Sequence, residues 1–189
     1  MIHWTVRRSV LLLALVGVVL AALPCTSGED GTEYTQYNIW FEKPMKVYST
    51  NYQRGTMLPA GSAVKDVKVI SRGSRKYVEF TVAESGLRIR VYWIRKHDAY
   101  GSFEAFRKRL LGTKNFAALV DGLSAAEVAA IREGSIEPGM SKKAVLVSVG
   151  YPPSRATATL DLPSWRYWES RFDTIEVRFE GDIVASILD

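Results

Sequence analysis

The chain has 189 residues, of which 47% are apolar and 24% charged, and its formal net charge is +5. This composition is ordinary for a globular protein of one or two small domains, and it excludes a disordered or low-complexity chain. Without residues 1–27 the charge falls to +3, because that segment holds two arginines and no acid. So balanced a charge gives no indication of nucleic-acid binding, and we expect no nucleic-acid partner.

Residues 1–27 have the order of a secretory signal peptide, with two arginines, an apolar run, a proline and then small residues. The apolar run extends from Val10 to Leu23, which is 14 residues. A helix needs about 20 residues to span a bilayer, so a removable signal is favoured over a permanent membrane helix. We therefore expect an exported protein, cut after Ser27.

Cys25 is the only cysteine and leaves a second interpretation of this segment open. A lone cysteine directly after the apolar run resembles a bacterial lipoprotein attachment site, although Pro24 stands where such a site has Gly or Ala. If Cys25 carries a lipid, the protein is anchored to a membrane, with the outer membrane favoured over the inner. If it is removed, the mature chain is periplasmic and has no disulfide.

Residues 28–38 are polar and are expected to form a flexible tether. Residues 39–97 contain short alternating apolar runs between turns rich in Gly and Pro, which predict four or five strands and a small all-β barrel. The clearest run is 87–94, which alternates with a period of two. In the strand predicted over residues 63–70, we expect Val64, Val67 and Val69 to be buried.

Residues 98–119 are expected to form a helical connector, with Ser102 as the cap of a helix that ends near Gly112. Residues 120–189 then predict a second domain. Ser124 and Glu127 have the spacing of a capping box at the start of one short helix.

A second short helix of this domain is predicted between Ser141, as its N-cap, and Gly150, which two prolines follow. Three strand patterns come after it, in residues 165–168, 174–180 and 183–188. The predicted fold class is therefore α+β. An N-terminal barrel and a helical connector precede a two-layer C-terminal domain of order α-α-β-β-β.

The C-terminal third resembles the SmpA/OmlA family, whose best-known members are envelope lipoproteins similar to BamE. The resemblance rests on the helix start GMS, the stop GYP, the aromatic strand WRY and the hairpin VRFEGDIVASI, all between Gly139 and Ile187. It covers about residues 120–189, and the hairpin has one residue fewer between phenylalanine and glycine than the family pattern. It implies protein contacts at the periplasmic face of a membrane, including contacts with outer-membrane assembly components. The same shape also occurs in β-lactamase inhibitor proteins.

The N-terminal half is similar to bacterial Src-homology-3-like barrels through the stretch RGTMLPAGSAV, in which a G-x-x-L-P-x-G turn precedes a strand. This similarity implies a barrel over residues 39–97. It adds no catalytic residue.

The sequence offers few side chains for chemistry. Outside the signal, His97 is the only histidine, so neither a Cys/His metal cluster nor a catalytic triad can form. No phosphate-loop pattern occurs. We therefore expect no enzymatic activity, no metal and no cofactor.

Two surfaces are candidates for binding. The first is an exposed patch on the C-terminal sheet that would bind a partner. Its residues are Arg166, Trp168, Arg171 and Phe172. The alternative interpretation is that Trp168 faces outward and binds no partner. The second is a groove on the barrel, which Tyr77, Arg90 and Tyr92 would line.

These surfaces lead to three hypotheses on function. The first is a scaffold or assembly factor of the bacterial envelope, which acts through the BamE-like domain on other envelope proteins. The second is a module that binds peptidoglycan or anionic lipid through the barrel. The third is a secreted protein inhibitor.

Overall fold

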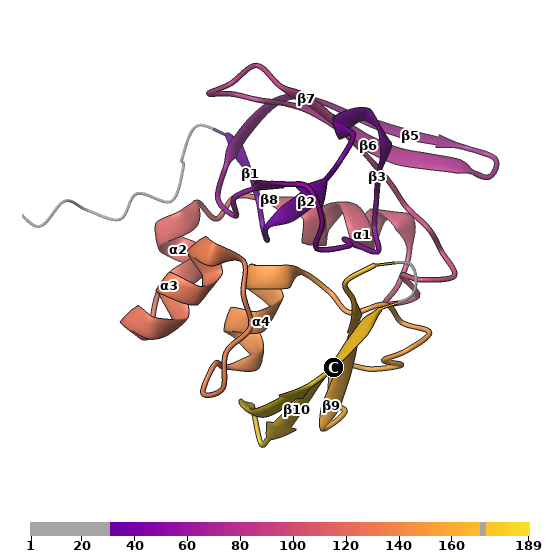
Figure 1. Ribbon diagram of the computed structural model, residues 1–189. Helices are drawn as coiled ribbons and strands as arrows, with labels where there is room; N and C mark the ends of the chain where they lie inside the picture. The colour runs from indigo at the N-terminus through magenta and orange to yellow at the C-terminus, as the bar shows by residue number, and fades with distance from the viewer. Residues whose placement is uncertain (1–30, 171–172) are drawn as a thin grey trace, which may run out of the picture.

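The computed structural model describes residues 31–170 and 173–189 (Figure 1). The predicted signal, Cys25, Arg171 and Phe172 lie outside the described residues. Within this part the fold is mixed α/β, with a curled six-stranded sheet, four α-helices and a three-stranded C-terminal sheet. We call residues 33–112 the first unit and residues 116–188 the second unit.

The curled sheet forms the first unit and has the strand order β3-β7-β6-β5-β1-β8. All neighbours are antiparallel except β3 and β7, which are parallel. A small sheet pairs β2, Ile39–Phe41, with β4, Thr56–Leu58. The strands of the curled sheet are β1 Glu33–Thr35, β3 Val47–Tyr48, β5 Ala63–Arg72, β6 Arg75–Val82, β7 Arg88–Tyr92 and β8 Leu111–Gly112.

Alternation along β6 and β7 gives the first unit its core. Val78, Phe80, Ile89 and Val91 point inward and are at most 2% exposed. Helix α1, Phe103–Leu110, closes the core with Phe103, Phe106 and Leu110, and it lies against the curled sheet in Figure 1. Its predicted cap is present, because Ser102 Oγ accepts a hydrogen bond from the Ala105 N–H.

The predicted tether over residues 28–38 is wrong from Glu33 onward. β1 pairs with both β5 and β8, and Thr35 is fully buried. The polar composition of this segment predicted exposure, but a polar side chain can be buried when its hydrogen bonds are made. Thr35 Oγ1 donates to the Pro59 carbonyl and accepts from the Ser62 N–H. The described chain therefore enters the sheet several residues before Ile39.

Two further expectations for the first unit need correction. The segment 98–119 does not act as a connector, because α1 supplies core side chains and β8 pairs with β1. Val69 is 44% exposed, although Val64 is buried and Val67 packs against the core. Val69 pairs with Val78, which is fully buried, but Val69 lies on β5, which with β6 forms a hairpin that extends away from the rest of the first unit in Figure 1.

The second unit has three helices where two were predicted, and they share one core with the sheet β11-β10-β9. The helices are α2 Phe116–Val120, α3 Ala125–Glu133 and α4 Lys142–Val149. The strands are β9 Ser164–Trp168, β10 Thr174–Glu180 and β11 Ile183–Leu188, close to the predicted ranges. Trp165 and Val177 lie in this core with at most 1% exposure, as the alternation of the strands predicts.

Both predicted caps of the second unit are present, and one side chain joins them. Glu127 completes the capping box with Ser124, and its other oxygen accepts hydrogen bonds from the N–H and the hydroxyl of Ser141, the N-cap of α4. Burial alone would raise the pKa of Glu127, but the hydrogen bonds from the two serines outweigh it and lower the pKa from 4.5 to about 2. One carboxylate therefore fixes the starts of α3 and α4 together.

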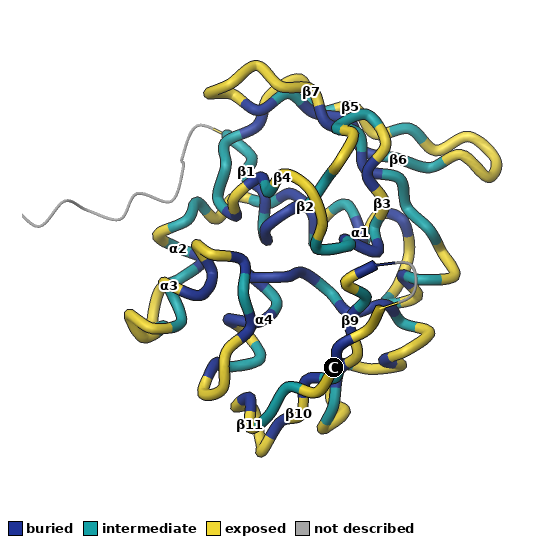
Figure 2. Tube along the Cα trace, in the orientation of Figure 1, coloured by how far each residue is buried: buried dark blue, intermediate teal, exposed yellow. Residues whose placement is uncertain are grey.

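The two units meet at a buried polar junction. Asn38 Nδ2 donates to the Ile131 carbonyl at 2.7 Å, and the Asn38 N–H donates to the Val147 carbonyl at 3.1 Å. Gly150 ends α4 at a φ of 80°, and a Cβ there would lie 2.9 Å from the Tyr37 ring. Figure 2 shows buried chain in both units and at the level where they meet.

A charged pair lies in the same junction. Arg109 Nη2 donates to Asp98 Oδ1 at 2.5 Å, and the side chains are 15% and 8% exposed. Burial raises the pKa of Asp98, and Arg109 opposes that rise. The guanidinium also lies 5.0 Å from the ring centroid of Tyr151, which belongs to the second unit.

Candidate ligand-binding site

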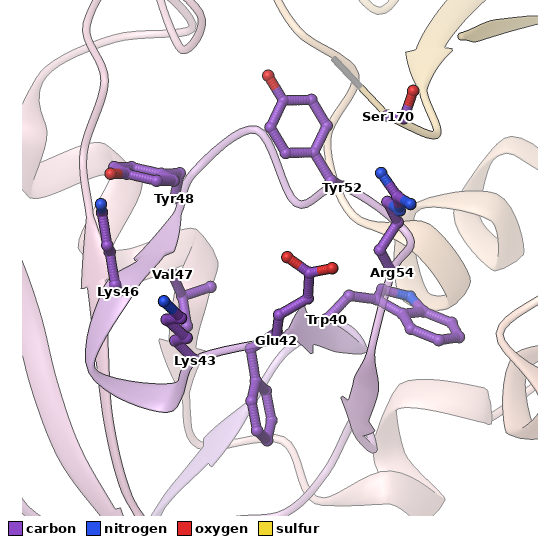
Figure 3. Close-up of a pocket in the computed structure, with 10 residues that line it drawn as sticks. Trp40, Glu42, Lys43, Lys46, Val47, Tyr48, Tyr52, Arg54 and Ser170 are labelled. Carbon is purple, nitrogen blue, oxygen red and sulfur yellow. The ribbon is translucent and has the colours of Figure 1, made fainter. Parts of the chain in front are cut away.

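A cavity of about 360 Å³ opens on the first unit beside the end of β9 (Figure 3). Its wall comes from one stretch of chain, residues 40–54, together with Ser170 of the second unit. The stretch begins in β2, continues through a short 3-10 helix at Pro44–Lys46 and β3, and ends in the loop that follows β3. Pro44 suits that turn because proline fits the first positions of a helix.

Asn51 holds the end of this stretch in place. It has a left-handed φ of 48°, which asparagine tolerates better than most residues. Its Oδ1 accepts a hydrogen bond from the Trp40 N–H at 3.0 Å. The side chain of the loop thereby fixes the backbone of β2, and the two sides of the cavity are held together.

Three cations and one carboxylate line the cavity. In Figure 3 Glu42 points toward its middle, with Lys43 and Lys46 on one side and Arg54 on the other. All four are exposed, and none of them has an ion-pair partner among the described residues. The cavity therefore carries a net charge of +2 that no neighbouring side chain neutralises.

Three other arginines of the first unit are paired, whereas Arg72, Arg75, Arg88 and Arg95 are exposed and have no ion pair among the described residues. Arg90, Arg107 and Arg109 are each less than a third exposed, and each pairs with a carboxylate at 2.5–2.6 Å. The exposed cations at the cavity keep their N–H donors free for a ligand.

Aromatic side chains complete the wall of the cavity. Trp40, Tyr48 and Tyr52 line it, and in Figure 3 Tyr48 lies beside the end of Lys46 and Tyr52 lies above Glu42. The indole N–H of Trp40 is buried and makes no hydrogen bond within the described residues. Leaving such a donor unpaired costs about 1–3 kcal/mol, which a ligand acceptor or a water would recover.

Trp168 belongs to this site rather than to an exposed patch. Its ring stacks on Tyr52, with centroids 6.1 Å apart and planes 14° apart, and it lies 5.0 Å from the His97 ring. The sequence predicted correctly that Trp168 faces away from the helices, but the first unit covers that side of the strand. Trp168 therefore supports one wall of the cavity from behind.

The rest of the expected patch does not come together with Trp168. Arg166 pairs with Glu176 at 3.0 Å, and Arg178 pairs with the same carboxylate at 2.9 Å. The outward face of β9 and β10 is thus a solvated ion-paired surface. Arg171 and Phe172 lie outside the described residues.

The expected barrel residues do lie together. The Tyr77 and Tyr92 rings are 5.3 Å apart, and the Arg90 guanidinium lies 4.6 Å above Tyr77. Arg90 is already engaged, because it pairs with Glu79 at 2.6 Å and donates to the Tyr92 hydroxyl at 3.3 Å. These residues form an ordered aromatic strip rather than a cavity of their own.

Sequence reasoning missed all seven residues that define this site, which are Trp40, Glu42, Lys43, Lys46, Tyr48, Tyr52 and Arg54. They are spread over fifteen positions without a regular period, so no motif marks them. The only available signal was the density of aromatic and basic residues before Gly55.

The described residues carry no arrangement that resembles a metal centre. Within residues 31–170 and 173–189, no group of three or more His, Cys, Asp or Glu side chains could hold a metal ion. In the same part of the chain, none of the helices has the length and apolar character needed to cross a membrane. Burial and the nearby Lys96 and Arg155 lower the pKa of His97, which faces Trp168.

Comparison of the chain with protein-family models, curated proteins and solved structures finds no match.

Proposed function

We propose that this chain is a non-enzymatic binding protein of the bacterial envelope and that its cavity takes an anionic fragment of peptidoglycan. The observation that carries the proposal is the convergence of Lys43, Lys46 and Arg54 on one aromatic cavity, where none of them has an ion-pair partner among the described residues. A volume of about 360 Å³ lies within the usual range for small-ligand pockets.

Each group at the cavity corresponds to a part of such a ligand. Lysine and arginine bind the carboxylates of the peptide stem with charge-assisted hydrogen bonds. Glu42 accepts from an ammonium or hydroxyl group of the same ligand. Trp40, Tyr48 and Tyr52 offer flat apolar surfaces to a sugar ring.

The envelope setting rests on the sequence. The order of charges and apolar residues in 1–27 supports export. The similarity of the first unit to Src-homology-3-like barrels and the resemblance of the second unit to the SmpA/OmlA family also come from the sequence. Both resemblances favour a binding role.

Calorimetric titration with a soluble muropeptide, a disaccharide that carries its peptide stem, tests the proposal. The variant Lys43→Ala/Lys46→Ala/Arg54→Ala is expected to weaken binding by roughly a hundredfold, because each lost charge-assisted hydrogen bond is worth about 1 kcal/mol or more. The control Lys108→Ala/Lys114→Ala removes two exposed lysines away from the cavity, on and beyond α1, and is expected to bind like wild type. Absence of wild-type binding, or equal loss in both variants, would refute the proposal.

A second candidate function is the assembly role implied by the SmpA/OmlA resemblance. It is favoured by Ile183 and Leu188, which are 46% and 41% exposed on the edge strand β11. In an envelope pull-down, Ile183→Ser/Leu188→Ser should then lose a partner that wild type recovers, while Trp168→Ala keeps it.

A further inference from the structure

A second cavity, of about 300 Å³, lies on the outer face of the same curled sheet. It forms where β5 has a bulge between Lys65 and Lys68, and Asp66 there takes a left-handed φ of 53°. Bulges of this kind re-aim side chains and occur often beside functional sites. Lys68, Glu79 and Arg88 are among the residues that line it.

A continuous line of contacts connects the second cavity to the first. Glu79 lines the second cavity and pairs with Arg90, which lies over Tyr77. Tyr77 contacts Tyr92 at 5.3 Å between ring centroids, and Tyr92 contacts Tyr48 at 6.0 Å. Tyr48 lines the first cavity. Every step in this line comes from a side chain on the outer face.

The strand register explains why these side chains line up. Tyr48 is paired with Tyr92, Tyr92 with Tyr77, and Glu79 with both Arg90 and Lys68. The line therefore crosses β3, β7, β6 and β5 side by side, which is three inter-strand spacings or about 14 Å. A single sugar or amino acid is too short to reach from one cavity to the other.

We propose that the two cavities and the aromatic strip between them form one binding track for a linear anionic glycan. The track is defined by the first cavity, by Tyr48, Tyr92, Tyr77 and Arg90, and by the second cavity. It rests on the proposed function, because the first cavity is its anchor. What it adds is a polymer as ligand and a second set of contacts at Lys68 and Arg88.

The direction of the track favours a glycan over a peptide. A peptide that binds a sheet gains most of its affinity by adding a strand along an edge, where backbone groups are free. This track runs across the strands, so a ligand meets only side chains. A sugar chain suits such a surface, since its hydroxyl groups bond to side chains and its ring faces lie on tyrosines.

The charge of the far cavity fits the same ligand. Lys68 and Arg88 are exposed and make no ion pair within the described part of the chain, whereas Glu79 is already bound to Arg90. Asp66 also lines this cavity, so with Glu79 neutralised by Arg90 its lining keeps a net charge of +1. Both free cations face the side of the sheet on which the track runs. They can contact acidic groups that recur along a polymer.

Titration with peptidoglycan glycan chains of two lengths, a disaccharide and an octasaccharide, each with peptide stems, tests the track. Lys68→Ala/Arg88→Ala is expected to weaken octasaccharide binding about tenfold, which is about 1.4 kcal/mol, and to leave disaccharide binding unchanged. Lys43→Ala/Lys46→Ala/Arg54→Ala should weaken both ligands. Lys108→Ala/Lys114→Ala, with the same charge change away from the track, should weaken neither.

The outcomes separate this inference from the proposed function. If the affinities for both ligands depend on the first cavity and Lys68→Ala/Arg88→Ala leaves the affinity for the octasaccharide unchanged, the track proposal fails and the first cavity remains the site. If wild type binds neither glycan, both proposals fail. If it binds vesicles with anionic lipid through Lys68 and Arg88 and no glycan, the surface serves a membrane and the track is wrong.

Discussion

The side chain of Asn51 bonds to the backbone of Asn38 inside the junction between the units. Asn51 Nδ2 donates to the Asn38 carbonyl at 2.9 Å and to the Val149 carbonyl, at the end of α4, at the same distance. Asn38 and Asn51 are 1% and 7% exposed. A residue of the first unit thus donates a hydrogen bond to a carbonyl at the end of a helix in the second unit. We therefore expect the two units to unfold together.

Asn51→Ala is therefore expected to destabilise both units together. It leaves the Asn38 and Val149 carbonyls and the Trp40 N–H without their partner, and the loss should be at least ~2 kcal/mol because each buried unpaired group costs about 1–3 kcal/mol. Urea titration followed by tryptophan fluorescence and by far-ultraviolet circular dichroism measures it. Two separated transitions in wild type would contradict the account.

Arg109→Met should be among the most destabilising single changes. It leaves the Asp98 carboxylate buried without its cation, which costs about 3–5 kcal/mol. The double variant Asp98→Asn/Arg109→Met removes the stranded charge and should recover part of the loss. Thermal unfolding of both variants checks this, and a double variant less stable than Arg109→Met would show that the carboxylate is satisfied by other groups.

Glu127→Gln should lower the free energy of unfolding at pH 7 by about 1–2 kcal/mol, because one carboxylate caps two helices. The folded-state pKa of Glu127, about 2, is below its unfolded value of 4.5. Its contribution is therefore full above pH 4.5 and disappears as the pH falls toward 2.

The measurement for Glu127 is urea unfolding of wild type and variant between pH 2 and pH 7, the range set by that pKa shift. The difference between them should shrink as the pH falls. Glu133→Gln, the same change at an exposed position of α3, is the control and should stay within ~0.5 kcal/mol at all pH values. A constant difference for Glu127→Gln would rule out the ionised cap.

Trp168→Leu should weaken muropeptide binding although Trp168 does not line the cavity. It removes the stack behind Tyr52, an aromatic pair worth about 0.5–1.5 kcal/mol. Trp168→Phe keeps a ring there and should restore most of the affinity. Titration of both variants, after their stability is measured, distinguishes positioning of Tyr52 from general loss of fold. Equal affinity in wild type and Trp168→Leu would contradict it.

Local chemistry made much of the second unit predictable. Ser124, Ser141 and Gly150 mark helix ends by their own hydrogen bonds and dihedral angles, so neighbouring residues were enough to place α3 and α4. The alternation in Thr174–Glu180 likewise predicted β10 without knowledge of its neighbours. The curled sheet was predicted only in outline.

The features that were missed depend on partners far along the chain. β1 is a strand only because β5 and β8 flank it, and its residues are polar. Trp168 was placed on the correct side of β9, but Tyr52, which covers it, is more than a hundred positions away. The cavity arises in the same way, from the fold of a loop that Asn51 holds in place.

The central claim is that the cavity of the first unit binds an anionic peptidoglycan fragment. Chemical-shift mapping of isotopically labelled protein during titration with the soluble muropeptide tests it most directly. The account predicts shifts concentrated at the Trp40 indole N–H and at the backbone of Lys46, Tyr48, Tyr52 and Arg54. Shifts confined to β9, β10 and β11, or none at saturating muropeptide, would contradict it.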